Sequence, residues 1–425
     1  MKKLLYISYL FPPVGGSGVQ RSLKFAKYLP EYGWEPIMLV ANHRFLKQPK
    51  DYSLSQDIDP KLIIYRTFSL DIRWFYKLLW GLKLHKLVNL LNSNFLIPDP
   101  DIMWLPYAKY ALKRIFKEHK IDLVFITAPP YSSLFLGDYV KQRFGVDYCV
   151  DFRDLWTKGV GRADNPPPQH IQAKEKEWEK QILIQAKQVL CVNEAMVSKL
   201  QQFVPEILRN KFSGITNGYD DTDFASAPAY KRQNEMHIVF TGSLYGRFQP
   251  DIIWQALSEL IEEGKISAHK IRFEIYGANS PNFVLGRYAA DSAIKSIVKI
   301  LAYLPHHTSI EMICLADALL VLSPVGNGSN TDSHSKLFEY MRSERPILAV
   351  VDLHSIGAQI LRKSGTSFIA DASSCTAVKA TIHEMYIKWE NAELYVNPDI
   401  AYINSFERKA LTAKLASVLN SACNR

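Results

Sequence analysis

The 425-residue sequence contains few cysteines and no long apolar stretch. Its five cysteines lie far apart and form no C-x-x-C pair, which argues against a disulfide framework and against a zinc site. No stretch reaches the roughly 20 apolar residues that span a bilayer. We therefore expect a cytoplasmic protein whose contact with a membrane would be peripheral, on the inner face.

The N-terminus imitates a secretion signal but lacks its defining parts. Lys2 and Lys3 precede an apolar run, yet this run is short, ends at Pro12 and has no small-residue cleavage site. We predict a first β-strand here, over residues 4–10.

The charge balance is moderately basic, with 51 Lys and Arg against 42 Asp and Glu and a formal net charge of +9. Such an excess suits anionic partners such as nucleotide diphosphates, anionic lipids or nucleic acids, without selecting one of them. No compact basic and aromatic recognition motif accompanies the charge, so a nucleic-acid binder is the least favoured class.

Short apolar runs bounded by turn residues alternate with helical patterns, which is typical of α/β proteins with parallel sheets. The chain is too long for one ordinary core, so we expect two doubly wound domains, over 1–217 and 236–400, a linker over 218–235 and a terminal helix within 401–425. The predicted strands are 4–10, 36–40, 123–127, 147–152 and 189–192, then 237–241, 271–276, 318–323 and 346–351.

A glycine-rich loop follows the first predicted strand and opens a helix. Its three glycines are Gly15, Gly16 and Gly18. Glycine lets the backbone approach a ligand closely, and a helix N-terminus offers free N–H groups to a phosphate. The plainer interpretation is a tight strand-to-helix turn. A dinucleotide fingerprint is not present, because Arg21 stands at the third glycine position, so a nicotinamide enzyme is disfavoured.

A second constellation lies before the strand at 346–351. On a helix, Lys336 and Glu339 share one face, so a cation for phosphate and a carboxylate for ribose hydroxyls can point into one site. The alternative is an ordinary surface ion pair. The position at the carboxyl edge of the predicted sheet favours a ligand site.

A series of short motifs in a fixed order gives the sequence a family resemblance over nearly its whole length. The motifs are Gly15–Gly18; Pro98-Asp99-Pro100-Asp101 with Trp104 and Pro106; Thr127-Ala128-Pro129-Pro130; Asp151-Phe152-Arg153-Asp154-Leu155-Trp156; Thr216-Asn217-Gly218-Tyr219-Asp220; Phe240-Thr241-Gly242-Ser243 with Arg247; Leu304-Pro305-His306; and Lys336-Leu337-Phe338-Glu339-Tyr340. In these motifs the chain resembles the family 4 glycosyltransferases, a retaining family with the GT-B fold.

The resemblance implies two Rossmann-like domains, an acceptor-side domain and a nucleotide-sugar-binding domain, with a cleft between them. It implies a hexosyltransferase-type enzyme that moves a sugar from a nucleotide-diphosphate donor to a saccharide or lipid-linked acceptor, with retention, in the synthesis of cell-surface polysaccharide or glycan. The nucleotide sugar is a substrate, and no cofactor is expected. The implied donor-binding residues are Gly15, Gly16, Ser243, Arg247, Lys336, Leu337 and Glu339. Arg247 and Lys336 would neutralise the diphosphate, so no metal is expected.

Several positions depart from the family pattern. Thr331 replaces the first acid of its E-x7-E motif, Ser243 replaces a common arginine, and Leu134 stands where many members have histidine. These departures suggest the alternative of a catalytically silent GT-B protein that binds a nucleotide sugar or a partner.

Charged residues also gather after the strand at 147–152. Asp151, Arg153 and Asp154 are the candidate catalytic residues, since a loop at the carboxyl end of a strand is the usual place for an active site. A structural Arg–Asp pair is an equally good interpretation.

Between Asp71 and Leu96 the sequence interleaves tryptophans and leucines with four basic residues. This composition suits docking on an anionic membrane surface, where a lipid-linked acceptor would lie. A helix packed on its own domain is the alternative.

Overall fold

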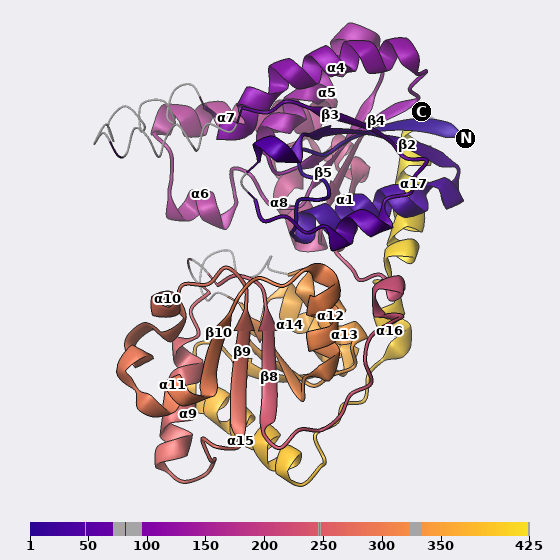
Figure 1. Ribbon diagram of the computed structural model, residues 1–425. Coiled ribbons are helices and arrows are strands. Elements are labelled where there is room, and N and C mark those ends of the chain that lie inside the picture. The colour runs from indigo at the N-terminus through magenta and orange to yellow at the C-terminus, as the bar shows by residue number, and fades with distance from the viewer. Residues whose placement is uncertain are drawn as a thin grey trace. The chain divides into compact units, whose positions relative to one another are not determined.

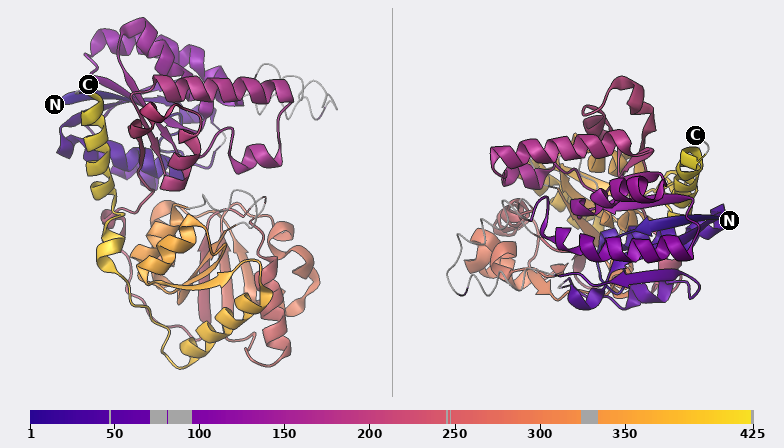
Figure 2. Two further views of the ribbon diagram at one scale, coloured as in Figure 1. Left: turned by 180° about the vertical axis from the view of Figure 1, so that it is seen from behind. Right: turned by 90° about the horizontal axis from the view of Figure 1, so that it is seen from above.

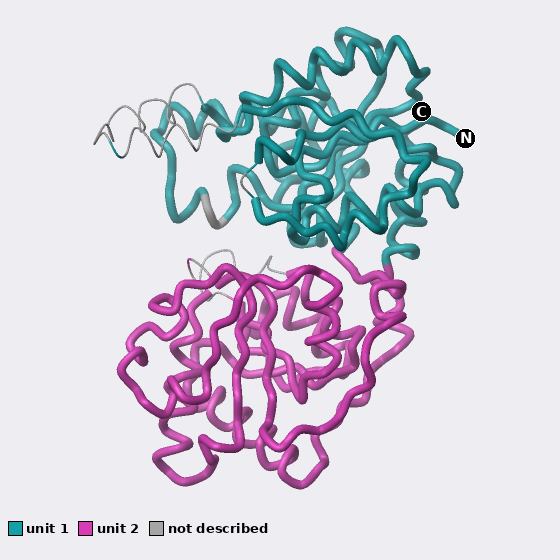
Figure 3. The backbone as a smooth tube through the Cα atoms, viewed as in Figure 1, with its two compact units in different colours: residues 1–216, 408–425 teal, residues 217–407 magenta. Residues whose placement is uncertain are grey.

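The structure is a computed structural model that describes residues 1–46, 48–70, 81, 96–244, 246, 248–323 and 334–423. The chain divides into two compact units, which Figure 3 distinguishes by colour. Unit 1 comprises residues 1–216 and 408–425, and unit 2 comprises residues 217–407. The chain therefore leaves unit 1, forms unit 2 and then returns to unit 1.

The described residues of unit 1 form a seven-stranded sheet in which all neighbouring strands are parallel (Figure 1). The strand order is β3-β2-β1-β4-β5-β6-β7. The order reverses between β1 and β4, which makes this the topological switch point of the sheet. The strands are β1 (Lys2–Ile7), β2 (Trp34–Ala41), β3 (Ile63–Thr67), β4 (Leu123–Ala128), β5 (Tyr148–Phe152), β6 (Gln188–Cys191) and β7 (Phe212–Gly214).

Helices cover both faces of this sheet, as the views in Figures 1 and 2 show. Helices α4 and α5 lie on one face, with α7 packed beside α5, while α1 and α17 pack together on the other. The central strands β4 and β5 are buried throughout, which explains their unbroken apolar runs. The helices are α1 (Ser17–Tyr28), α4 (Leu105–Glu118), α5 (Phe135–Phe144), α6 (Val160–Asp164), α7 (Gln169–Gln185), α8 (Glu194–Gln201) and α17 (Arg408–Cys423).

Helix α17 completes the core of unit 1. Leu411, Leu415 and Leu419 recur at a spacing of four residues and are buried in the same hydrophobic cluster as the central strands. The sequence predicts a terminal helix within 401–425, and the structure has α16 (Ile400–Asn404) in unit 2 and α17 in unit 1.

The described residues of unit 2 form a six-stranded parallel sheet in the order β10-β9-β8-β11-β12-β13. Its switch point lies between β8 and β11. The strands are β8 (Met236–Thr241), β9 (Ile271–Tyr276), β10 (Val298–Leu301), β11 (Ala318–Leu322), β12 (Ile347–Val351) and β13 (Ser367–Asp371). Residues 218–235, expected as a linker, belong to this unit, and Tyr219 among them is buried.

Two hydrophobic clusters cover the two faces of the second sheet. Successive residues of a strand enter them alternately: Leu320 belongs to one cluster, and Leu319 and Val321 belong to the other. The helices are α9 (Asp251–Glu262), α10 (Pro281–Leu285), α11 (Ser292–Ile297), α12 (His306–Leu315), α13 (Lys336–Arg342), α14 (Ile356–Ser364), α15 (Cys375–Glu390) and α16. In the part of the chain that the structure describes, no helix is both long and apolar enough to cross a membrane.

Candidate functional site

In unit 1 the glycine-rich loop joins β1 to α1. Gly16 precedes the helix with φ 117° and ψ 157°, a conformation that glycine adopts without strain. The Gly15 N–H donates to the carbonyl of Pro49 at 2.9 Å, so this amide fixes the loop. The amides of Gly16, Ser17 and Gly18 donate to no other residue in the described part of the chain. These amides and the helix dipole favour an anion at this end of α1.

Arg153 lies against the same helix start. Its Nε donates to the Ala128 carbonyl at 3.3 Å, and Nη2 donates to the carbonyl of Pro129. Its Nη1 is buried and has no hydrogen-bond partner among the described residues. A Cβ on Gly18 would lie 2.1 Å from this Nη1, so glycine at position 18 makes room for the guanidinium. A spare cationic donor therefore accompanies the free amides of α1.

Asp151 has a different environment from the one expected for a catalytic acid. Its side chain is fully buried and forms a two-point ion pair with Arg21 on α1, with Nη2 to Oδ1 at 2.8 Å and Nε to Oδ2 at 3.0 Å. The Thr127 hydroxyl donates to Oδ2 at 2.9 Å. Because both oxygens are bound, Asp151 joins α1 to β4 and β5, and a structural role fits it better than direct catalysis. Asp154 is exposed on the loop after β5.

The loop after β5 is also anchored to buried acids on α7. Glu179 is fully buried, accepts from the Thr157 hydroxyl at Oε2, and has no partner for Oε1 among the described residues. Burial raises the pKa of Glu179 to about 7. One turn earlier, Glu175 pairs with Arg162 at 2.5 Å.

The buried Glu179 leads to a prediction about pH. An unfolded chain releases this proton near pH 4.3, whereas the folded chain holds it until about pH 7. The contribution of Glu179 to stability is therefore largest below pH 4.3 and falls as the pH rises to 7, by on the order of 3 kcal/mol. We expect Glu179→Gln to stabilise the protein, relative to the wild type, by more at pH 8 than at pH 5, because glutamine has no proton to lose. Urea unfolding at both pH values checks this, and an unchanged pH dependence would contradict it.

In unit 2 the carboxyl end of β8 forms a tight turn. Gly242 has φ 131°, and its carbonyl accepts from the Asn279 amide at 3.1 Å. The Asn279 side chain also accepts from the Leu244 N–H at 2.6 Å. A Cβ on Gly277 would lie 2.2 Å from the Gly242 carbonyl oxygen, so the two backbones are in direct contact. Ser243, the residue after Gly242 in this turn, is exposed.

Lys336 reaches this turn from α13. Its Nζ lies 3.6 Å from the centroid of the Phe240 ring, and a Cβ on Gly242 would lie 2.8 Å from it. The side chain is half-buried. A cation held over an aromatic ring at the carboxyl edge of the sheet is placed where an anionic ligand would meet it.

Glu339 lies in the first turn of α13 and is only 8 % exposed. Its Oε1 is 2.9 Å from Nε2 of His306, the first residue of α12. The other ring nitrogen of His306 lies 3.9 Å from Oδ2 of Asp223. Glu339 Oε2 accepts from no residue in the described ranges, so one oxygen is fixed and the other can accept from a ligand.

Two of the donor-binding residues that the sequence predicts remain, Leu337 and Arg247. Leu337 packs in the core, and its N–H donates to the His334 carbonyl at 3.2 Å, so neither group is offered to a ligand. Arg247, Thr331 and nearly all of the 71–96 segment lie outside the described residues. His306 was not among the predicted site residues. It is the first residue of α12, separated from the end of β10 by four residues, and its signal in the sequence is its place in the Leu304-Pro305-His306 motif.

Comparison with known proteins finds matches among solved structures. No protein-family model and no curated protein sequence matches the chain. Its structure is similar to a sucrose-phosphate synthase from Thermosynechococcus elongatus, with a TM-score of 0.65, 13% identity and 99% of each chain covered. It is also similar to a glycosyltransferase from Rickettsia africae, with a TM-score of 0.62, 14% identity and coverage of 99% of this chain and 98% of that one.

A third similar structure is TarM from S. aureus, in a complex with UDP and alpha-GlcNAc-glycerol, with a TM-score of 0.60, 11% identity and 100% of each chain covered. The fold is of the GT-B type. The predicted fold class is thereby confirmed: two doubly wound α/β domains, each with a parallel sheet covered by helices.

Proposed function

We propose that the protein is a glycosyltransferase that transfers a sugar from a nucleotide-diphosphate donor to a saccharide or lipid-linked acceptor. The observation that carries the proposal is that Lys336 and Glu339 both lie in the first turn of α13, at the carboxyl edge of the unit 2 sheet. One side chain supplies a fixed positive charge and the other a buried, oriented carboxylate. A nucleotide diphosphate carries the complementary groups, which are anionic phosphates and a ribose with two hydroxyls.

In this proposal the Lys336 ammonium binds the diphosphate and Glu339 Oε2 accepts from a ribose hydroxyl. His306 donates to Oε1 and so holds the carboxylate in place. When the bond between the sugar carbon C1 and the phosphate oxygen breaks, negative charge grows on the leaving diphosphate. A preorganised cation stabilises that charge without rearrangement. The acceptor oxygen then bonds to C1, and its proton passes to the leaving group. Retention of configuration follows from the family resemblance.

Unit 1 has a second group of anion-binding features, the free amides at the start of α1 and the Nη1 of Arg153. We assign them to a phosphate of the donor or of the acceptor. Arg153 replaces Asp151 as the main candidate of this unit, because Asp151 is bound by Arg21 and Thr127.

The first experiment is a thermal-shift screen of a panel of UDP-, GDP- and ADP-sugars. We expect one of them to stabilise the protein and to be hydrolysed slowly without an acceptor. Stabilisation without hydrolysis, and without transfer to any acceptor, would favour the catalytically silent alternative. The absence of any shift would contradict the proposal.

Replacement of Glu339 by glutamine should lower kcat/KM for the donor by about tenfold to a hundredfold. Glutamine keeps the volume and an acceptor for His306, but it loses the charge that strengthens a hydrogen bond to ribose by roughly 1.5–3 kcal/mol. Glu311→Gln, a carboxylate on the surface of α12, is the matched control and should leave turnover unchanged. A loss below about threefold for Glu339→Gln would remove this residue from the site.

Donor turnover should persist in a metal chelator. The proposed site neutralises the diphosphate with the charge of Lys336, so the reaction requires no bound ion. Initial rates with and without EDTA are the measurement, with a metal-dependent glycosyltransferase as the positive control for chelation. Complete loss in EDTA that magnesium or manganese restores would contradict the prediction.

A further inference from the structure

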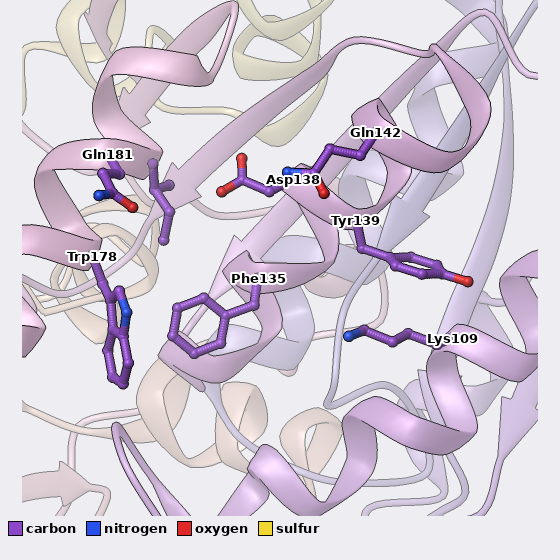
Figure 4. A pocket seen from close by; sticks show the side chains of 8 residues that line it. Lys109, Phe135, Asp138, Tyr139, Gln142, Trp178 and Gln181 are labelled. Carbon is purple, nitrogen blue, oxygen red and sulfur yellow. The ribbon is translucent and has the colours of Figure 1, made fainter.

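Unit 1 has a cavity of about 300 Å³ in the helical layer on one face of its sheet. Helices α4, α5 and α7 form it, and Figure 4 shows the side chains from all three. Its lining residues are Lys109, Phe135, Asp138, Tyr139, Gln142, Trp178, Gln181 and Ile182. The volume is at the lower end of the range for small-molecule sites.

The aromatic part of the cavity is built by α5 and α7. The rings of Phe135 and Trp178 meet edge to face, with centroids 5.1 Å apart and an interplanar angle of 77°. Both side chains are half-buried, so part of each ring faces solvent. The ring of Tyr139 lies under the ammonium of Lys109, which is 4.9 Å from its centroid. Rigid aromatic surfaces of this kind offer large contact area at low cost in conformational entropy.

The polar part is oriented by the protein itself. Tyr148 on β5 donates its hydroxyl proton to Asp138 Oδ1, and burial raises the pKa of this tyrosine, so the proton stays on it. Gly137 allows the contact, because a Cβ there would lie 2.5 Å from the Tyr148 ring. Asp138 Oδ2 has no hydrogen-bond partner in the described part of unit 1. In Figure 4 the Asp138 side chain points from α5 toward Gln181 on α7.

The chemistry of the lining selects a class of ligand. The two charged residues of the lining, Lys109 and Asp138, carry opposite charges. The lining therefore has no net positive charge that would favour an anion such as a phosphate. Gln142 and Gln181 each donate and accept, Asp138 accepts and Lys109 donates. Hydroxyl groups, which also donate and accept, match this set, and the C–H face of a pyranose ring matches the aromatic surfaces.

We propose that this cavity is a second carbohydrate site that binds one sugar residue of a neutral oligosaccharide, separate from the donor site. The choice of a saccharide rests on the proposed function, because an enzyme that extends a glycan meets long acceptors. A site on the outer helical layer would hold such a chain and raise its local concentration near the enzyme.

Saturation-transfer NMR with maltotriose, cellotriose and chitotriose tests the proposal on the full chain. We expect at least one of these trisaccharides to bind, and Trp178→Ala and Asp138→Asn each to weaken its affinity about tenfold. Gln181→Ala is a third variant, chosen because its exposed side chain does not support the fold. Lys176→Ala, on an exposed position of α7 outside the cavity, is the matched control and should bind normally.

The outcomes separate this proposal from the proposed function. No binding of any of the three trisaccharides, or equal binding by all variants, would overturn the carbohydrate site. Thermal shift with nucleotide sugars on the same variants reports on the donor site alone. If the wild-type protein binds a trisaccharide but no nucleotide sugar, the proposed function is overturned and this site stays in place.

Discussion

Replacement of Arg21 by methionine should lower the free energy of unfolding by about 3–5 kcal/mol. Arg21 and Asp151 are both fully buried and bind each other through two hydrogen bonds of 2.8 and 3.0 Å. Methionine fills a similar volume but leaves the buried Asp151 carboxylate hydrogen-bonded only by Thr127, and it removes the hydrogen bond from Arg21 Nη1 to the Thr216 carbonyl at 2.8 Å. The buried carboxylate then lacks its hydrogen-bonded counter-charge, which costs free energy. Urea unfolding followed by tryptophan fluorescence gives the value.

Two further variants show whether the buried pair is the cause. Arg143→Met, at an exposed position of α5, should change the free energy of unfolding by less than about 0.5 kcal/mol. The double variant Arg21→Met with Asp151→Leu removes both charges and should recover a large part of the loss. If the double variant is less stable than Arg21→Met alone, the uncompensated charge is not the main cost.

Replacement of Lys336 by methionine should lower kcat for donor hydrolysis by about a hundredfold or more. The residue supplies the cation that stabilises the departing diphosphate, and loss of one such group costs roughly 2.7–4 kcal/mol of transition-state stabilisation. In the wild-type protein Lys336 Nζ lies 3.6 Å from the centroid of the Phe240 ring. The apolar methionine side chain can keep packing against this ring, so the fold should persist. Steady-state kinetics with the nucleotide sugar found in the screen give the ratio.

The control for this variant is Lys295→Met, which removes an exposed lysine of α11 in the same unit. It changes the net charge equally and should leave kcat unchanged. A comparable loss in both variants would show an effect of overall charge. A rise in KM with constant kcat for Lys336→Met would make Lys336 a residue of ground-state binding.

The strands that the sequence predicts and those it does not predict differ in burial. The strands β4 and β11 are buried along their whole length and therefore appear as apolar runs. In β9 the apolar residues alternate with Arg272 and Glu274, and the sequence predicts this strand with the bounds that the structure has, 271–276. The strands β3, β7, β10 and β13 were not predicted, and all four are edge strands. Every residue of β3 is half-buried, so its sequence lacks the continuous apolar run. Edge strands need tertiary context for their assignment.

The need for tertiary context also explains which contacts of the candidate site the sequence does not predict. The spacing of Lys336 and Glu339 could be read from the sequence because both lie on one helix. The partner of Glu339 is His306, which is 33 residues away and follows β10, one of the strands without an apolar run. Arg21 and Asp151 are 130 residues apart, and only the pairing of β1, β4 and β5 brings them together. Local patterns carry no information about such contacts.

The return of α17 to unit 1 has a consequence for the order of folding during synthesis. Leu411, Leu415 and Leu419 belong to the core of unit 1, but the ribosome makes them after all of unit 2. Unit 2 is a continuous segment and can fold as soon as it emerges, whereas unit 1 must wait with the surface beside α1 uncovered. A chain that stops at residue 407 would therefore contain every residue of unit 2 and an aggregation-prone unit 1. Unit 1 is synthesised first, but it can complete its core only after α17 has been synthesised.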